Sequence, residues 1–224
     1  MRLIGGLDLG QSADHSALCL VERVRLDQPR FRRRHQYVIR LLDEYPLGVS
    51  YTDQVGRVVK TLSHDKVRGA SVAVDYTGVG RPVFDLLRDA RPPVVLYPLL
   101  TTSGHAVTHD RETREYHVPK SQQVALLQVL LQADLLTAHP KLPTAARLRD
   151  QLARFRVKIT KAKNEVFGAE SGANDDLVSA VMLAVWLGEH VGGGDPSAIR
   201  VGGGSGEPAA ASAVDTAPPG VFLP

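Results

Sequence analysis

The stretch Leu3-Ile4-Gly5-Gly6-Leu7-Asp8-Leu9-Gly10 (residues 3–10) decides how the chain folds, because it is a short apolar run with one carboxylate near its closing glycine. Such a run predicts a buried central β-strand, in which Asp8 interrupts the apolar row. Burying a carboxylate is costly unless a cation lies against it. Asp8 could instead cap a turn, since aspartate is common where strands end. Whether other carboxylates converge on Asp8 decides between the two interpretations.

The composition is that of a globular protein. Of the 224 residues, 43% are hydrophobic, which suits one sizeable domain or two small ones and is too low for a membrane protein. No apolar run approaches the length of a membrane span, and Asp8 interrupts the first run too early for a signal peptide. Cys19 is the only cysteine, so no internal disulfide can form, and no Cys/His cluster has zinc spacing. These features indicate a protein of the reducing cytoplasm.

Hydrophobic patterning predicts three antiparallel strands at the start of the chain. A polar turn at residues 11–15 joins the first strand to a second at 16–24, and a turn that contains Pro29 leads to a third at 35–45. Helices and strands alternate afterwards, which implies parallel pairing in a layered α/β fold. The expected strands are 70–75 and 93–99, and the expected helices are 50–63, 82–90, 120–135, 143–153 and 174–190, with a long loop or small hairpin over 103–118.

The overall expectation is an α/β fold with a mixed sheet, whose first three strands are antiparallel and whose later strands are parallel, with helices on both faces. The last helix is apolar nearly all round, which is typical of a central buried helix. The chain divides into a domain over 1–191 and a tail over 192–224. The tail is rich in Gly, Ala, Pro and Ser and is expected to be disordered, with a short docking segment at Val221-Phe222-Leu223.

Three acidic positions are expected to converge on one edge of the sheet. Asp8 and Asp75 each end a predicted strand, and Asp175-Asp176 open the last helix. The carboxyl ends of parallel strands share an edge, where ligands usually bind. Several ionised carboxylates cannot stand side by side without a cation, and such oxygen ligands suit Mg²⁺ or Mn²⁺. Taken singly, each acid could be a turn residue or a first-turn helix acid beneath an Asn174 cap. Taken together on apolar elements, they favour a two-metal site for phosphodiester cleavage.

Four stretches resemble one known family. They are Gly6-Leu7-Asp8 with Asp14-His15-Ser16-Ala17, Val74-Asp75-Tyr76-Thr77-Gly78-Val79-Gly80, Val118-Pro119-Lys120, and Asn174-Asp175-Asp176-Leu177-Val178-Ser179-Ala180. Across residues 3–190 the chain resembles the nuclease domain of tailed-phage terminase large subunits, in the ribonuclease H-like superfamily. The resemblance implies a metal-dependent endonuclease that cuts concatemeric viral DNA during packaging. It also implies that Asp8, Asp75 and Asp176 are the catalytic residues and main ligands of two Mg²⁺ or Mn²⁺ ions, with Asp175 assisting.

The chain departs from the family in two respects. Members often carry a histidine before the paired aspartates, where this chain has Asn174. A complete terminase large subunit also contains an ATPase, and no Gly-x-x-x-x-Gly-Lys-Ser/Thr loop occurs here. The sequence is therefore either a nuclease domain cut from a longer chain or a separately encoded nuclease.

Clustered bases predict a DNA-contacting surface, although the net charge is only +3. Between residues 147 and 163 there are seven bases and one acid, and Lys120 opens a predicted helix. The expected phosphate-contacting residues are Lys120, Arg147, Arg149, Arg154, Arg156, Lys158, Lys161 and Lys163. The expected partners are double-stranded DNA and, through the resemblance, a separate packaging ATPase, a small terminase subunit and a portal, in the host cytoplasm and with no membrane.

Three other functions compete with the terminase interpretation. A RuvC-like Holliday junction resolvase would use the same fold and metals, but it needs a dimer and a junction-shaped surface. Leu7-Asp8-Leu9-Gly10-Gln11-Ser12 resembles the first phosphate loop of sugar-kinase and actin-like ATPases, which need two such domains. A non-enzymatic DNA-binding module would explain the basic stretch and leave the carboxylates unexplained.

Overall fold

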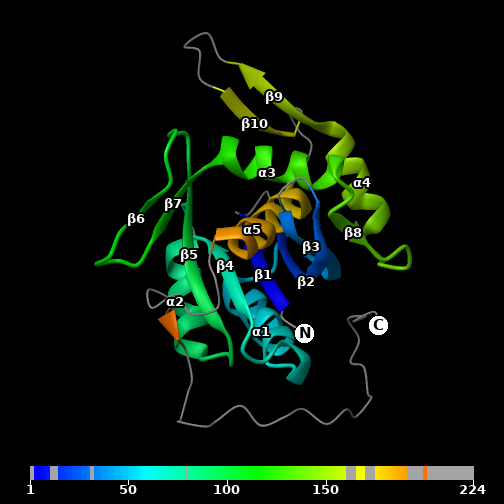
Figure 1. Cartoon of the computed structure of the whole chain (residues 1–224). Helices are drawn as coiled ribbons and strands as arrows, with labels where there is room; N and C mark the ends of the chain where they lie inside the picture. Colours follow the sequence, from blue (N-terminus) through cyan, green and yellow to red (C-terminus); the bar gives the residue numbers. More distant parts are fainter. Residues whose placement is uncertain are drawn as a thin grey trace.

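The computed structural model describes residues 3–10, 15–30, 33–78, 80–159, 165–169, 175–190 and 199–200, and Figure 1 shows the arrangement of their helices and strands. The strands are β1 (Leu3–Asp8), β2 (Ser16–Arg30), β3 (Arg33–Tyr45), β4 (Ser71–Asp75), β5 (Val95–Thr102), β6 (Thr108–His109), β7 (Tyr116–Pro119), β8 (Leu136–Ala138), β9 (Phe155–Ile159), β10 (Glu165–Ala169) and β11 (Ile199–Arg200). The helices are α1 (Tyr51–Leu62), α2 (Gly80–Ala90), α3 (Lys120–Gln132), α4 (Ala145–Arg154) and α5 (Asp176–His190), with a short 3₁₀ helix η1 (Asp65–Val67).

The main sheet is mixed and has the strand order β6-β7-β5-β4-β1-β2-β3-β8, with β11 beside β5. β1, β2 and β3 pair antiparallel, whereas β4 pairs parallel with β1, β5 with β4, and β7 with β5. The predicted fold is confirmed: an antiparallel start is followed by parallel strands. Because β1 and β4 are parallel neighbours, their carboxyl ends lie at the same edge of the sheet.

Helices cover both faces of the sheet, as predicted. α3, α4 and α5 contribute the residues of one hydrophobic core and α1 and α2 those of another, and Figure 1 shows α5 lying across the middle of the strands. Even residues of β1, such as Ile4, belong to the core beneath α5, and odd residues, such as Leu3 and Leu7, belong to the core beneath α1 and α2. This alternation places the side chain of Asp8 on the α5 face.

The packing of α5 against β1 depends on Gly6. A Cβ atom at Gly6 would overlap the backbone of Ala180 and Ala184 in the middle of α5. The helix therefore lies directly against the strand backbone, with no side chain between them. This contact fixes where the first turn of α5, and with it Asp176, meets the sheet edge.

A β-bulge in β3 changes which of its residues face α5. Leu20 of β2 pairs with Leu41, but the next residue, Val21, pairs with Ile39, so Arg40 is an extra residue in β3. Arg40 turns toward Glu22, and their closest oxygen and nitrogen atoms are 2.6 Å apart. Beyond the bulge the alternation is shifted by one residue, and Leu42 lies in the core beneath α5.

The structure corrects several details of the sequence interpretation. Residues 103–118 contain the small hairpin of the two predicted alternatives, since β6 and β7 pair antiparallel. Strand β8 was not predicted, because three residues are too short to give a periodic signal. The hairpin of β9 and β10 was also missed, although Phe155, Val157 and Ile159 alternate with bases in the typical strand pattern.

Parts of the predicted tail lie outside the described residues, including Val221-Phe222-Leu223. Within 192–224 the structure describes Ile199–Arg200, which form β11 and pair antiparallel with Val95 and Leu96 of β5. The disorder expected of the tail as a whole stays a prediction. None of the helices in the described part of the chain has the length and apolar character needed to cross a membrane.

Candidate active site

Asp8 and Asp75 lie side by side at the carboxyl edge of the sheet, as predicted. Leu7 of β1 pairs with Val74 of β4, so the two aspartates that follow are also neighbours. Both are half-buried, and the negative charge of Asp75 raises the pKa of Asp8. A pair of this kind carries charge that a cation would neutralise.

The turn after β4 holds the Asp75 side chain in place. The Thr77 backbone N–H donates to Asp75 Oδ1 at 2.9 Å, which closes an Asx turn. A Cβ atom at Gly80, the first residue of α2, would overlap the backbone carbonyl of Asp75. Glycine at this position therefore lets the chain fold back sharply beside the carboxylate.

Lys120 supplies positive charge to this side of the site. It opens α3, lines a pocket of about 220 Å³ together with Asp8 and Asp75, and places Nζ 3.6 Å from Asp175 Oδ2. Its charge lowers the pKa of both Asp8 and Asp75, although burial outweighs this effect in each case. Lys120, predicted only as a phosphate-contacting residue, thus lies beside the acidic residues and pairs with one of them.

Burial and mutual repulsion raise the pKa of the acids. Burial is the largest cause for Asp8, followed by the charges of Asp75, Asp176 and Asp175, and the pKa of Asp8 lies well above its usual value. Burial, assisted by the charge of Asp175, raises the pKa of Asp176 to about 6. The four carboxylates predicted from the sequence therefore interact electrostatically at one edge of the sheet.

Asp176 reaches the site from the first residue of α5. The start of this helix is capped by another helix, because Gln151 Oε1 of α4 accepts hydrogen bonds from the backbone N–H groups of Leu177 at 3.0 Å and Val178 at 3.4 Å. Asn174, the expected cap, lies outside the described residues. Asp176 is only 5% exposed, and its Oδ2 atom finds no hydrogen-bond donor in the described part of the chain. A buried acceptor of this kind is a place for a cation.

The carboxylate oxygens are suited to a hard divalent cation, although the side chains are not yet arranged to coordinate one. Among the described residues, no group of three or more His, Cys, Asp and Glu side chains is close enough to hold a metal ion as it stands. Asp8 and Asp75 lie side by side, and Asp176 Oδ2 has no hydrogen-bond partner in the described residues. Carboxylate oxygens are the ligands that Mg²⁺ and Mn²⁺ prefer, so an ion would balance the charge of these acids and satisfy the unpaired oxygen.

Two residues near Asp176 were not among the predicted site residues. His15 precedes β2 and lies near enough for its positive form to lower the pKa of Asp176. Glu44 of β3 acts in the opposite direction, and its Oε2 atom lies 2.8 Å from Nη1 of Arg147. The sequence contained a signal for His15, which follows Asp14 in one of the four family-like stretches, but none for Glu44.

The predicted DNA-binding bases are spread over α4 and the β9–β10 hairpin. Arg147, Arg149 and Arg154 are exposed on α4, with Arg147 paired to Glu44. Arg156 and Lys158 belong to β9, which Figure 1 shows in a hairpin projecting beyond α3 and α4, away from the main sheet. Lys161 and Lys163 lie outside the described residues.

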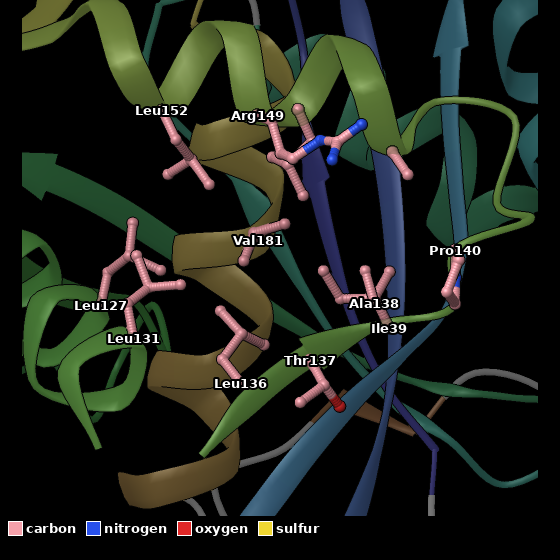
Figure 2. A pocket seen from close by; sticks show the side chains of 12 residues that line it. Ile39, Leu127, Leu131, Leu136, Thr137, Ala138, Pro140, Arg149, Leu152 and Val181 are labelled. Atoms are coloured by element: carbon pink, nitrogen blue, oxygen red, sulfur yellow. The ribbon is translucent and has the colours of Figure 1, made fainter. Parts of the chain in front are cut away.

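Arg149 borders a second pocket, which is apolar and separate from the carboxylates. This pocket has a volume of about 350 Å³ and lies between α3, α4, α5 and the β3–β8 edge of the sheet. Figure 2 shows Leu127, Leu131, Leu136 and Val181 directed toward the space, with Arg149 beside it. The two pockets differ in chemistry, and only the one bounded by Asp8 and Asp75 has ligands for a metal ion.

The mixed sheet and its strand order are those of a ribonuclease H-like fold. Solved structures of large terminase nucleases share it. The large terminase nuclease of thermophilic phage G20c superposes with a TM-score of 0.57 at 22% identity, over 83% of this chain and 81% of that one. The human cytomegalovirus terminase nuclease domain gives 0.52 at 17% identity, over 85% and 84%.

The large terminase of bacteriophage HK97 superposes with a TM-score of 0.51 at 14% identity, over 82% of this chain but only 39% of the HK97 protein. The G20c nuclease has been solved with bound magnesium and with bound cobalt, and the cytomegalovirus domain after a manganese soak. No protein-family model and no curated protein matches the sequence. This chain therefore has the fold of large terminase nuclease domains, as the four sequence stretches suggested.

Proposed function

We propose that this chain is a divalent-metal-dependent DNA endonuclease that cuts concatemeric viral DNA during genome packaging. The observation that carries the proposal is the meeting of Asp8, Asp75 and the buried, unpaired Asp176 at one sheet edge. The shared fold with terminase nucleases that were solved with bound metals supports the same function.

In this proposal Asp8, Asp75 and Asp176 hold two Mg²⁺ or Mn²⁺ ions, and Asp175 assists. When bound, such ions lower the pKa of an attacking water and stabilise the charge on the leaving oxygen. Asp8 would help to hold both ions, because it neighbours Asp75 across the β1–β4 pairing and the charges of both Asp75 and Asp176 act on it. Lys120, at the mouth of the same pocket, is placed to contact a backbone phosphate.

The DNA is expected to extend from the carboxylates over the exposed bases of α4 toward the β9–β10 hairpin. Arg149 and Arg154 are exposed on α4, and Arg156 and Lys158 continue the basic stretch along β9. Contacts to phosphates make binding strong at low salt and nearly independent of sequence. In the virus-infected cell, the partners would be double-stranded DNA, a packaging ATPase, the small terminase subunit and the portal, in the host cytoplasm.

The decisive test is nicking of supercoiled plasmid in Mg²⁺ or Mn²⁺ by the wild-type protein and by the Asp8→Asn variant. Loss of a shared metal ligand is expected to reduce cleavage by at least about 100-fold while DNA binding is retained. Asp89→Asn is the matched control, because Asp89 is an exposed acid at the far end of α2. This variant should cleave the plasmid at the wild-type rate. Wild-type cleavage by Asp8→Asn would show that Asp8 is only a turn residue and would overturn the proposal.

A four-way junction offered beside linear DNA separates packaging nuclease from junction resolvase. Preference for the junction would favour the resolvase, and equal cleavage would favour the packaging nuclease. Binding without cleavage in either metal would leave the chain as a DNA-binding module.

A further inference from the structure

A row of paired residues crosses the sheet at its carboxyl edge and continues past Asp8. Asp8 pairs with Ala17 of β2, and Ala17 pairs with Glu44 of β3. Residues that pair across neighbouring strands point to the same face, so Asp8, Ala17 and Glu44 all face α5. Neighbouring strands are about 4.8 Å apart, which places the Cα atoms of Asp8 and Glu44 about 10 Å from each other. The residue between them in this row is Ala17, whose side chain is a single methyl group.

The Glu44 side chain is buried and has one carboxylate oxygen without a hydrogen-bond partner in the described residues. Its side chain is only 10% exposed, and Oε1 finds no hydrogen-bond donor in the described residues. Its other oxygen, Oε2, pairs with Arg147, whose side chain is half exposed and free to turn toward solvent. Asp176, which also has a buried and unpaired oxygen, lies close enough to Glu44 for the two to interact electrostatically. Glu44 thus lies on the side of Asp8 away from Asp75, and each of the two acids, Glu44 and Asp176, has a buried oxygen with no partner in the described residues.

We propose that Glu44 is a further ligand of the divalent ion held by Asp8 and Asp176, with Ala17 leaving the room for that ion. This inference rests on the proposed function. In the metal-free protein Arg147 supplies the positive charge that the ion would bring, and it is released toward solvent and DNA when the ion enters. Arg147 then belongs to the DNA surface only after the metal has bound.

A purely structural role is the alternative. Arg147 is on α4 and Glu44 on β3, so their ion pair could simply fasten the helix to the strand. The Thr144 hydroxyl already joins these elements, since its Oγ1 donates to the Leu42 carbonyl at 2.7 Å. A fastening role would make Glu44 and Arg147 equally important for stability and would leave metal binding unchanged.

The test is Mn²⁺ binding to the purified full chain, measured by calorimetry and by the electron paramagnetic resonance signal of free Mn²⁺. Glu44→Gln keeps the shape of the side chain and removes its charge. Asp43→Asn is the matched control, because Asp43 is a half-buried acid next in sequence whose partner, Leu18, lies in the core of the opposite face. Arg147→Gln breaks the same ion pair from the other side and leaves Glu44 charged.

We expect Glu44→Gln to weaken the binding of one of two Mn²⁺ ions by about tenfold or more, a typical effect of losing a group that supports a metal. Asp43→Asn should bind like the wild type, and Arg147→Gln should bind as tightly or more tightly. Wild-type binding by Glu44→Gln, or equal weakening in Glu44→Gln and Arg147→Gln, would overturn the inference. If the wild-type protein binds no Mn²⁺ at all, the proposed function fails, and this inference with it.

Discussion

The two sides of Asp8 differ in how their negative charge is balanced. Toward Asp75, the acids have the charge of Lys120 and the Thr77 backbone N–H, and they border an open pocket. Toward Asp176, the acids are more deeply buried, and the pKa of Asp176 is raised to about 6. The first side is compensated by Lys120 and a backbone N–H, whereas on the second side Arg147 pairs with one oxygen of Glu44, and Glu44 Oε1 and Asp176 Oδ2 have no hydrogen-bond partner in the described residues. From this difference we expect that the stability of the metal-free protein, and the strength of the metal binding proposed above, depend mainly on the Asp176 side.

The largest expected effect is the loss of cleavage when an acid on either side is replaced by asparagine, and the stability of the same variants distinguishes the two sides. Asp75→Asn and Asp176→Asn should each reduce plasmid nicking by at least about 100-fold, since each removes a proposed metal ligand. Asp176→Asn should also stabilise the metal-free protein by about 1 kcal/mol, because it removes an unpaired buried charge. Asp75→Asn should change stability less, because Asp75 already has compensating partners. Nicking assays and urea unfolding in EDTA measure both effects, and equal stabilisation by the two variants would contradict the comparison.

The next effect is the pH dependence of stability. The raised pKa values of Asp8, Asp75 and Asp176 mean that the folded metal-free protein binds protons more tightly than the unfolded chain. Its stability should therefore fall as the pH rises from about 4 through about 6. Mg²⁺ at about 100 times its Kd should restore about 2.7 kcal/mol near neutral pH and less in acid, where protons compete for the same oxygens. Thermal unfolding in Mg²⁺ and in EDTA, once near neutral pH and once in acid, checks this. An equal increase in Tm on adding Mg²⁺ at the two pH values would exclude the carboxylates as the binding groups.

Lys120 tests the compensated side. Lys120→Met should lower the stability of the metal-free protein by about 0.5–1 kcal/mol, because a partly buried ion pair with Asp175 is lost and the repulsion between Asp8 and Asp75 grows. Mg²⁺ should reduce the difference from the wild type, since it replaces the missing positive charge. Lys60→Met is the control, because Lys60 is an exposed lysine in the last turn of α1. A deficit that persists unchanged in saturating Mg²⁺ would mean that Lys120 does not serve the acidic site.

Asp175 should give the smallest effect. Its side chain is 26% exposed and paired with Lys120, so Asp175→Asn removes an assisting charge and not a main ligand. We expect cleavage to fall by only about threefold, which is about 0.7 kcal/mol. Single-turnover cleavage rates at saturating Mg²⁺ measure the difference. A loss as large as that of Asp176→Asn would reverse the assigned order of the two neighbours.

Much of the site could be predicted because its acids sit where elements begin and end. Asp8 and Asp75 close apolar strands, and strand ends in a parallel layer share an edge whatever the details of packing. Asp176 begins a helix with a clear apolar pattern. The ion pair between Lys120 and Asp175 was out of reach, since it depends on how α3 and α5 approach each other in space.

Glu44 shows why the rest could not be predicted. Simple alternation from Tyr37 and Ile39 would direct Asp43 toward α5 and Glu44 toward the opposite face. The extra residue at Arg40 shifts the pattern, and no local sequence signal marks a bulge in a strand with so regular a composition. The side-chain direction of every later residue in β3 depends on that one position.

The direct contact between Gly6 and α5 has a consequence for how the gene can vary. Every amino-acid replacement of glycine adds at least a Cβ atom, which would push against the backbone of Ala180 and Ala184. A helix moved at this point carries Asp176, about one turn before Ala180, away from the sheet edge. A random-mutagenesis selection for inactive protein should therefore recover substitutions at position 6 together with those at the carboxylates, although Gly6 has no side chain with which to touch metal or DNA.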